Sequence, residues 1–402
     1  MMLNKYAKVA LQIGLNLQEG QILFIKAPLD AREFVEEVVN EAFNLGAHDV
    51  YVRWNDEVVT KYRLKNAPID ALKEYPKWEI MASQYLLDKK GAMLSITGAD
   101  PDALKDVPPE RIGIYTKTVN IANKEIMKRM MSNEISWCVV AYPSKKWAKK
   151  VLGEENTEKL LEYILKASRI EGNPVENWKK HIEKLTHITK YLNEKQFDYL
   201  IYEGPGTNLQ VGLPKEHIWI SGSQKNKQDI VFVPNIPTEE VFTAPHKDKI
   251  NGVVSNSLPL VYGGNIIDKF TLTFKDGKII NYDAKIGKDI LETILNTDEG
   301  ARRLGEVALV SVESPIYQMK KIFYNTLFDE NAASHFAFGR AYPSCVKNGE
   351  KLSDEQLKEV GLNSSLTHVD FMIGNEKMNV WGVKGTEKVQ IMKNGLFTIP
   401  NL

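Results

Sequence analysis

The sequence lacks most of the features that place a chain in a specialised class of protein. Only two cysteines, Cys138 and Cys345, occur in 402 residues. Two cysteines are too few for a disulfide framework, and neither belongs to a CxxC pair that could hold structural zinc or carry out redox chemistry. We expect both to be small buried apolar residues in a protein of the reducing cytoplasm.

Long hydrophobic runs are also lacking. A membrane-spanning helix needs about 18 apolar residues in succession, and the sequence offers no such run. The N-terminal segment MMLNKYAKVALQIGLNLQEG mixes charged with apolar residues and has no small-residue cleavage site. We therefore expect a protein that is not exported and has no membrane partner.

An excess of charge of one sign is the third missing feature. Lys and Arg together number 52, as do Asp and Glu. A balanced chain has no general attraction for the phosphates of nucleic acid or for anionic lipid, so we expect no nucleic-acid partner. Hydrophobic residues make up 43% and charged residues 26%, which is the composition of an ordinary globular protein with well-buried cores.

The first half of the sequence has the alternation of an α/β fold. Four short runs rich in Ile, Val and aromatic residues predict strands at 22–28, 49–54, 92–99 and 135–143. Amphipathic stretches separate them, which predicts a mainly parallel sheet with helical crossovers. One such helix is predicted at 30–46, with Asp30 as its N-cap, Gly46 at its end, and a buried stripe of Phe34, Val38, Val39 and Phe43.

The second half is richer in short strands, which indicates a mixed α+β fold. Strands are predicted at 229–234, 251–256, 269–285 and 366–374, and the KDGK turn at 275–278 predicts a hairpin. A single core rarely organises more than about 250–300 residues, so two domains are expected. We place an N-terminal α/β domain at 1–190 and a C-terminal domain that carries the functional site at 191–402.

Most familiar catalytic signatures are missing, so function must come from dispersed residues. There is no HExxH motif, no phosphate-binding loop and no GxSxG motif. In Thr367-His368-Val369-Asp370, residues i and i+2 of a strand point to one face, so His368 and Asp370 converge. Imidazole nitrogen and carboxylate oxygen suit a divalent cation. The triplet is too common by chance to decide the function alone.

Four further residues could bind a metal or take part in catalysis, but each could equally have a purely structural role. His335 and Tyr342 lie in ASHFAFGRAYPSC, where a core histidine and a packing tyrosine would be equally natural. Glu240 in PNIPTEEVFTAP and Glu306 in GEVALVSV are carboxylates in apolar settings. Burial of a carboxylate is unfavourable unless it is paired or binds a cation, but a helix-end charge or a solvated strand end would also explain them.

The segments PNIPTEEVFTAP, GEVALVSVESPI, HFAFGRAYPSC and LTHVDFMIG occur in this order between residues 234 and 374. Together they resemble the aminopeptidase T/aminopeptidase S family of thermophilic-type metallo-aminopeptidases. The resemblance implies a homodimer with two divalent metal ions per chain, zinc, cobalt or magnesium. By position it implies metal ligation by Glu240, Glu306, His335, His368 and Asp370, with Tyr342 as a site tyrosine that also binds metal.

This family resemblance predicts a metal-dependent hydrolase, an exopeptidase that removes N-terminal amino acids from peptides with a free N-terminus. Two cations bridged by Glu306 would activate a water molecule as the nucleophile. Glu306 and Tyr342 are the predicted catalytic residues, with the tyrosine hydroxyl as a possible donor to the oxyanion. The free α-amine would bind an open metal position or a nearby carboxylate such as Glu239.

Two other functions use the same residues. A two-metal phosphohydrolase is one, because Arg340 lies close in sequence to His335 and Tyr342. An inactive peptide-binding scaffold is the other. The remaining histidines are expected to be dispensable for catalysis: His217 and His246 as turn or surface residues, and His48, His181 and His187 because they lie outside the metal-bearing half.

Overall fold

The computed structural model describes residues 2–263 and 265–402 and divides the chain into two compact units. The first unit comprises Met1–Lys180 and Ser223–Pro237, and the second comprises His181–Gly222 and Thr238–Leu402. The predicted boundary near residue 190 lies in helix α10 (Pro174–Lys195), the same helix in which the first division occurs. The segment 223–237 returns to the first unit, so each unit is built from two stretches of sequence.

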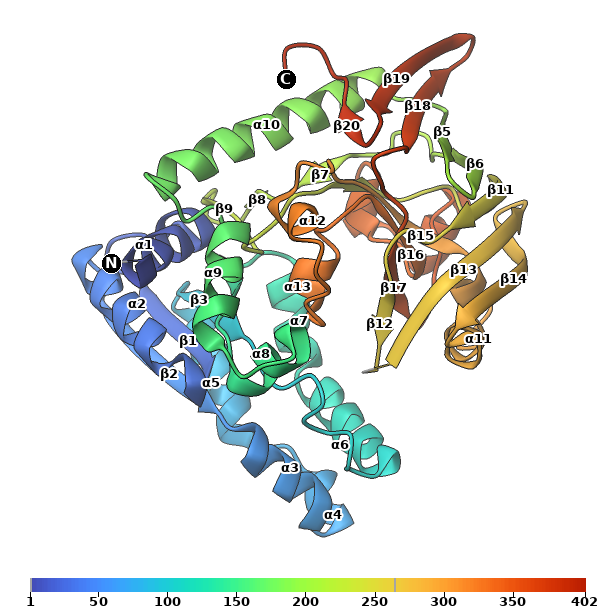
Figure 1. The fold of residues 1–402 in the computed structure, drawn as a ribbon. Helices are drawn as coiled ribbons and strands as arrows, with labels where there is room; N and C mark the ends of the chain where they lie inside the picture. Colours follow the sequence, from blue (N-terminus) through green and yellow to red (C-terminus); the bar gives the residue numbers. More distant parts are fainter. Residues whose placement is uncertain (1, 264) are drawn as a thin grey trace. The chain divides into compact units, whose positions relative to one another are not determined.

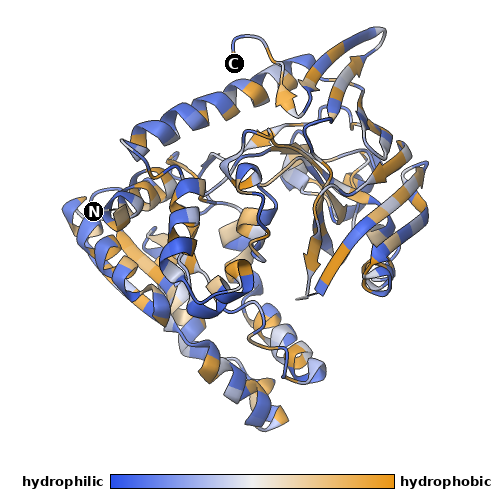
Figure 2. Ribbon diagram, in the orientation of Figure 1, coloured by the Kyte–Doolittle hydropathy of each residue, from blue (hydrophilic) through white to orange (hydrophobic). Residues whose placement is uncertain are grey.

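A parallel four-stranded sheet organises the first unit (Figure 1). Its order is β2-β1-β3-β4, with β1 at Ile22–Pro28, β2 at Asp49–Asn55, β3 at Ala92–Thr97 and β4 at Trp137–Ala141. Neighbouring strands are parallel throughout, as the alternation of strands and helices predicted. Strand β1 is hydrophobic along most of its length, as Figure 2 shows, because both of its faces are covered.

The helices of the first unit connect and cover these strands. They are α1 (Met2–Lys8), the π-helix η1 (Val9–Leu15), η2 (Leu29–Ala31), α2 (Arg32–Asn44), α3 (Glu57–Asn66), α4 (Ile69–Leu72), α5 (Lys77–Asp88), α6 (Pro109–Ala122), α7 (Lys124–Met131), α8 (Lys145–Leu152) and α9 (Thr157–Ala167). The returning segment adds the two-stranded sheet of β8 (Gln224–Lys225) and β9 (Val231–Phe232). The strand predicted at 229–234 is therefore shorter than expected.

Helix α2 corrects two details of the prediction. Asp30 is not its N-cap, because it lies in the 3-10 turn η2 and Ala31 occupies the cap position without a side-chain hydrogen bond. Phe34 and Val38 are buried as predicted, but Phe43 is 52% exposed, so the apolar stripe ends before the last turn. Gly46 has φ +84° just beyond the helix, a conformation that favours glycine.

Two sheets form the second unit. A five-stranded sheet has the order β17-β16-β15-β10-β7, with β7 at Ile220–Ser221, β10 at Val241–Thr243, β15 at Leu304–Leu309, β16 at His335–Gly339 and β17 at His368–Met372. A nine-stranded antiparallel sheet contains β5 (Tyr199–Gly204), β6 (Thr207–Gly212), β11 (Ile250–Ser255), β12 (Leu260–Tyr262), β13 (Asn265–Lys275), β14 (Lys278–Ile286), β18 (Asn379–Lys384), β19 (Glu387–Lys393) and β20 (Leu396–Phe397). The KDGK hairpin is confirmed, since Lys275 pairs with Lys278 between β13 and β14.

Short helices connect the strands of the second unit. They are α11 (Lys288–Leu295), η3 (Gly300–Arg302), α12 (Pro315–Met319), α13 (Thr326–Asp329), η4 (Pro343–Cys345), η5 (Gly349–Lys351) and α14 (Asp354–Glu359). The two sheets share a core, because Phe371 of β17 contacts Phe270 of β13 with ring centroids 5.5 Å apart. Phe336 of β16 likewise contacts Tyr202 of β5 at 5.0 Å. This packing fixes the strands on which the candidate site lies.

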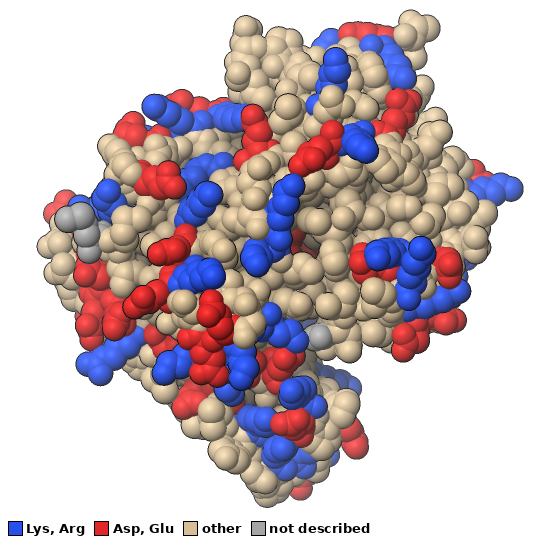
Figure 3. Space-filling view, viewed as in Figure 1, with Lys and Arg blue, Asp and Glu red and all other residues tan. Residues whose placement is uncertain are grey.

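The surface carries charges of both signs. Figure 3 shows Lys and Arg interspersed with Asp and Glu over the visible face, in keeping with their equal numbers in the sequence. Both cysteines are free and buried, as predicted. Among the described helices, none is both long enough and apolar enough to cross a membrane.

Candidate metal centre

The five-stranded sheet gathers chemistry-bearing residues on one face. Strand β16 alternates, with Phe336 and Phe338 in the shared core and His335 and Ala337 on the opposite face. Ala337 pairs with Glu306 of β15 on one side and with Asp370 of β17 on the other. Side chains in such a cross-strand row point the same way, so the two carboxylates flank a methyl group small enough to leave space between them.

A register irregularity beside this row helps to aim Glu306. The pairing of β15 with β16 shifts between Leu304 and Glu306, at Gly305. A Cβ atom on Gly305 would lie only 2.2 Å from the carbonyl oxygen of Arg340, so the close approach of the two chains requires glycine. The irregularity thus directs Glu306 toward the site while Leu304 stays in the core.

The ligand atoms form two groups that share one residue. In the first, His335 Nε2 lies 3.2 Å from Glu240 Oε2 and 3.3 Å from Glu306 Oε1. In the second, His368 Nε2 lies 3.8 Å from Glu306 Oε2 and 3.4 Å from Asp370 Oδ1. Within each group of three residues the ligand atoms lie within 4.8 Å of one another. Glu306 therefore presents a different oxygen to each histidine.

Hydrogen bonds to backbone carbonyl groups hold both histidines in one orientation. Nδ1 of His335 lies 3.1 Å from the oxygen of Ala333, and Nδ1 of His368 lies 2.7 Å from the oxygen of Arg340. Since a carbonyl oxygen only accepts, each Nδ1 carries the proton and donates it. With Nδ1 engaged in this way, Nε2 is the ring nitrogen that faces the carboxylates, which is the arrangement of a metal-binding histidine.

The buried carboxylates perturb one another. Burial, helped by the charges of Asp370 and Glu240 and opposed by the hydrogen bond from His335, raises the pKa of Glu306 to about 7. Burial alone would lower the pKa of His368, but the carboxylate of Asp370 outweighs it and raises that pKa to about 9. Negative charge is thus crowded into a buried site where, among the described residues, His335 and His368 form the ion pairs with the carboxylates.

The donor set fits a divalent cation. Asp370 Oδ1 is buried and, apart from its ion pair with His368 Nε2 at 3.4 Å, has no well-formed hydrogen bond among the described residues. Glu306 is 5% exposed and His335 is 1% exposed. A bound cation would use this oxygen and offset the repulsion among the carboxylates, and oxygen with imidazole nitrogen is a donor set that such ions accept.

Comparison with known proteins identifies the family. The family described as "Thermophilic metalloprotease (M29)" matches residues 1–397. The chain belongs to this metalloprotease family. It is 45% identical to "Aminopeptidase 2" of Geobacillus stearothermophilus over 98% of the chain and 97% of that protein. It is 38% identical to "Aminopeptidase T" of Thermus aquaticus over 99% of the chain and 98% of that protein.

A solved structure extends the similarity to the fold. "Wild-type AmpT from Thermus thermophilus" superposes on this M29 chain with a TM-score of 0.92 at 37% identity, covering 99% of each chain. The family resemblance of the four sequence segments and the two-part α/β and α+β fold are therefore confirmed. A hydrolase that acts on peptide bonds is likewise confirmed, and the phosphohydrolase and inactive-scaffold alternatives are not favoured.

The structure of this M29 protein adds one carboxylate that sequence reasoning missed. Glu330 follows α13 in the connection to β16, and burial followed by the charges of Glu240 and Asp370 raises its pKa well above the usual value. Its neighbour Asp329 is held differently, because its oxygens accept the N–H groups of Phe323 and Asn325. The acidic pair preceding ASHF was the only sequence signal, and it has no distinctive spacing.

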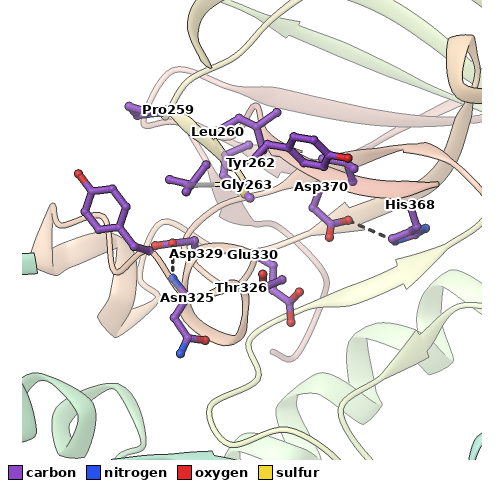
Figure 4. A pocket seen from close by; sticks show the side chains of 14 residues that line it. Pro259, Leu260, Tyr262, Gly263, Asn325, Thr326, Asp329, Glu330, His368 and Asp370 are labelled. Carbon is purple, nitrogen blue, oxygen red and sulfur yellow. Dashed lines mark hydrogen bonds and ion pairs between the residues drawn. The ribbon is translucent and has the colours of Figure 1, made fainter. Parts of the chain in front are cut away.

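A cavity of about 320 Å³ opens beside the second group of ligand atoms (Figure 4). His368 and Asp370 lie on one side of it and Asp329 and Glu330 on another. Strand β12 contributes apolar residues, including Leu260, to a further wall. The candidate metal centre of the M29 chain is therefore accessible through a pocket that is part acidic and part apolar.

Tyr342 lies beside the cluster, with its ring centroid 5.0 Å from that of His368. It is 39% exposed, yet its pKa is raised because surrounding protein atoms desolvate the hydroxyl group and because Glu306 is negatively charged. Arg340 is exposed and contributes its carbonyl oxygen to His368. Glu239 is 6% exposed and lies 3.8 Å from His181, and it does not line the pocket.

Two expectations about the other histidines are corrected. His181 belongs to the second unit, and its Nε2 bonds to the carbonyl oxygen of Thr238 at 2.8 Å, two residues before Glu240. His181 therefore does not lie outside the metal-bearing half, and neither does His187, which belongs to the same unit. His217 is only 2% exposed, so it is a buried residue rather than a surface one.

Proposed function

We propose that this metalloprotease is an aminopeptidase that removes N-terminal amino acids from peptides, with two divalent ions, Zn²⁺, Co²⁺ or Mg²⁺, held at the cluster. The observation that supports two ions is the pair of ligand groups joined by Glu306. Glu240, Glu306 and His335 would hold one ion, and Glu306, His368 and Asp370 the other. When bound, such ions polarise a scissile carbonyl group and lower the pKa of water toward neutrality.

The residues of the chain have separate roles in this proposal. Glu306 would contribute to holding both ions, since Oε1 faces His335 and Oε2 faces His368. Tyr342 lies at the edge of the centre, with its ring centroid 5.0 Å from that of His368, and its hydroxyl group would donate to the developing oxyanion. Glu330 supplies a further oxygen donor for the ions or for the α-ammonium group of the substrate.

The pocket supports an exopeptidase with a free-amine substrate. Its volume is large enough for one amino-acid side chain beside the ligand groups, and its acidic wall attracts a positively charged N-terminus. We assign the recognition of the α-amine to Glu330 rather than to Glu239, because Glu330 lines the pocket and Glu239 does not. The apolar wall at Leu260 would contact the side chain of the N-terminal residue.

Removal and restoration of the metal tests the proposal. Chelator-treated protein should lose at least about 99% of its activity on aminoacyl-p-nitroanilides, because charge stabilisation by the ions contributes several kcal/mol to the barrier. Zn²⁺, Co²⁺ or Mg²⁺ should restore cleavage, and N-acetylated substrates should stay uncleaved throughout. Full activity without metal, or equal cleavage of acetylated substrates, would refute the proposal.

We further propose that the protein is a cytoplasmic homodimer. Free, buried cysteines suit a reducing compartment. Trp78, Met81 and Tyr85 form an exposed apolar stripe along α5, with 64%, 65% and 48% exposure, which is typical of a surface that a partner covers. Light scattering coupled to gel filtration should give about twice the 45.6 kDa chain mass, and cell fractionation should place the activity in the cytosol. A monomer or a secreted enzyme would overturn these assignments.

A further inference from the structure

The loop between α13 and β16 contains a fully buried asparagine whose polar groups are all used. Asn331 is 0% exposed. Its Oδ1 accepts the backbone N–H of Glu239 at 2.7 Å, and its Nδ2 donates to the carbonyl oxygen of Leu327 at 3.1 Å and to Glu330 Oε1 at 3.4 Å. The backbone oxygen of Asn331 accepts from the hydroxyl group of Ser314 at 2.8 Å.

These bonds connect two segments that carry carboxylates of the metal centre. Glu239 immediately precedes Glu240, which lies in a connection before β10 rather than in a regular strand. Glu330 immediately precedes Asn331 and also lies outside any helix or strand. Neither carboxylate is placed by a sheet ladder, in contrast to Glu306 and Asp370. The backbone N–H of Glu330 bonds to the oxygen of Thr326 at the end of α13, and Asn331 adds a side-chain contact to each of the two segments.

We propose that Asn331 is a positioning residue that holds Glu240 and Glu330 in place for metal binding. The inference rests on the proposed metal centre and adds a residue that touches neither substrate nor reacting atoms. An amide suits the role because one end accepts a backbone N–H while the other donates to an oxygen atom. Loss of such an outer partner typically weakens metal affinity by about 10–100-fold.

Aspartate at this position gives a selective test. Asn331→Asp retains an oxygen for the N–H of Glu239 but replaces the NH₂ group with an oxygen that faces Leu327 O and Glu330 Oε1. Asn331→Ala removes all three side-chain bonds. Titration of the metal-free variants with Co²⁺, followed by visible absorption and calorimetry, should show affinity at least about tenfold weaker than that of the unaltered protein. Saturating Co²⁺ should restore most of kcat.

Asn226 provides a matched control in the first unit. It is 5% exposed, its Oδ1 accepts the N–H groups of Gln228 and Ile230, and its Nδ2 donates to Ser136 Oγ at 3.0 Å. Asn226→Asp should lower the melting temperature of the metal-free protein while its Co²⁺ affinity stays within about twofold of the original. The Asn331 variants should lose Co²⁺ affinity, unlike Asn226→Asp. A purely structural role of Asn331 would not cause that loss.

The outcomes separate the inference from the proposed function. Normal Co²⁺ affinity in a folded Asn331→Asp protein, or lost activity that saturating Co²⁺ does not restore, would overturn the positioning role. If neither Asn331 variant folds, Ser314→Ala serves instead: it removes the bond to the Asn331 backbone oxygen together with the N-cap bond to the N–H of Ile316 in α12. It should weaken Co²⁺ binding in the same direction, and unchanged affinity would again overturn the role. Asn331-dependent Co²⁺ binding without peptidase activity would refute the proposed function alone.

Discussion

Replacement of Glu306 by glutamine should abolish activity and stabilise the metal-free protein. Glu306 is the residue shared by both ligand groups, so its loss should remove the bridge and lower kcat/KM by about three orders of magnitude, equivalent to several kcal/mol of charge stabilisation. Glutamine has nearly the same shape but no charge. Activity assays and metal analysis of purified Glu306→Gln protein measure the first effect.

The opposite effect on stability follows from the raised pKa. The carboxyl group of Glu306 has a usual pKa of 4.5 and a folded pKa of about 7. The folded state favours the protonated form of Glu306. The stability that this protonated side chain contributes is fully present below about pH 4.5 and is lost as the pH rises through 7. Glutamine is uncharged at every pH, so the variant does not lose this stability as the pH rises. Metal-free Glu306→Gln should therefore melt at least about 2 °C higher than the original protein at pH 8, with no difference at pH 4.5.

Glu41 offers the corresponding control. It is another buried glutamate, 5% exposed, and it accepts a hydrogen bond from Gln12 in the first unit. Glu41→Gln should leave metal content and activity unchanged. Equal activity of Glu306→Gln and the original enzyme would remove Glu306 from the centre, and a metal-free variant less stable at pH 8 would show that its charge is favourable there.

Regular elements could be predicted from the sequence because their patterns reflect local geometry. Strand β1 matches its predicted range of 22–28, since an apolar run ending in proline has few other structures open to it. The end of α2 was predicted wrongly, because the spacing that places Phe43 on the helix stripe says nothing of whether the core extends that far. The return of 223–237 to the first unit likewise depends on tertiary packing alone.

In the candidate site, too, the residues placed by local geometry could be predicted from the sequence, and those placed by tertiary packing could not. His368 and Asp370 were brought together by strand periodicity, which operates over two residues. Glu306 joins them only through the register with Ala337, which the sequence does not encode in any short pattern. The resemblance to a family assigned Glu306 to the site, which periodicity could not do. Glu330 was missed because its proximity to the cluster comes from an irregular connection.

Substitution of His368 by alanine should remove metal and activity with little effect on folding. Nε2 of His368 faces Glu306 and Asp370, and the side chain is 23% exposed at the wall of the pocket. The space left by alanine therefore opens to water instead of forming a closed void. We expect bound Co²⁺ to fall toward one ion per chain and kcat/KM to fall at least about a hundredfold, measured by metal analysis and peptide hydrolysis.

His217 makes this test specific, because its environment resembles that of His368 in one respect only. Its Nδ1 bonds to the carbonyl oxygen of Pro214 at 2.9 Å, but its buried Nε2 has no hydrogen-bond partner among the described residues. His217→Ala should cost about 1–3 kcal/mol of stability through the unpaired carbonyl group while metal content stays normal. A His368→Ala protein that retains its full metal content would show that the strand pair His368 and Asp370 is structural. Both histidines donate Nδ1–H to a carbonyl group, so loss of that bond alone cannot explain a difference in metal content between the two variants.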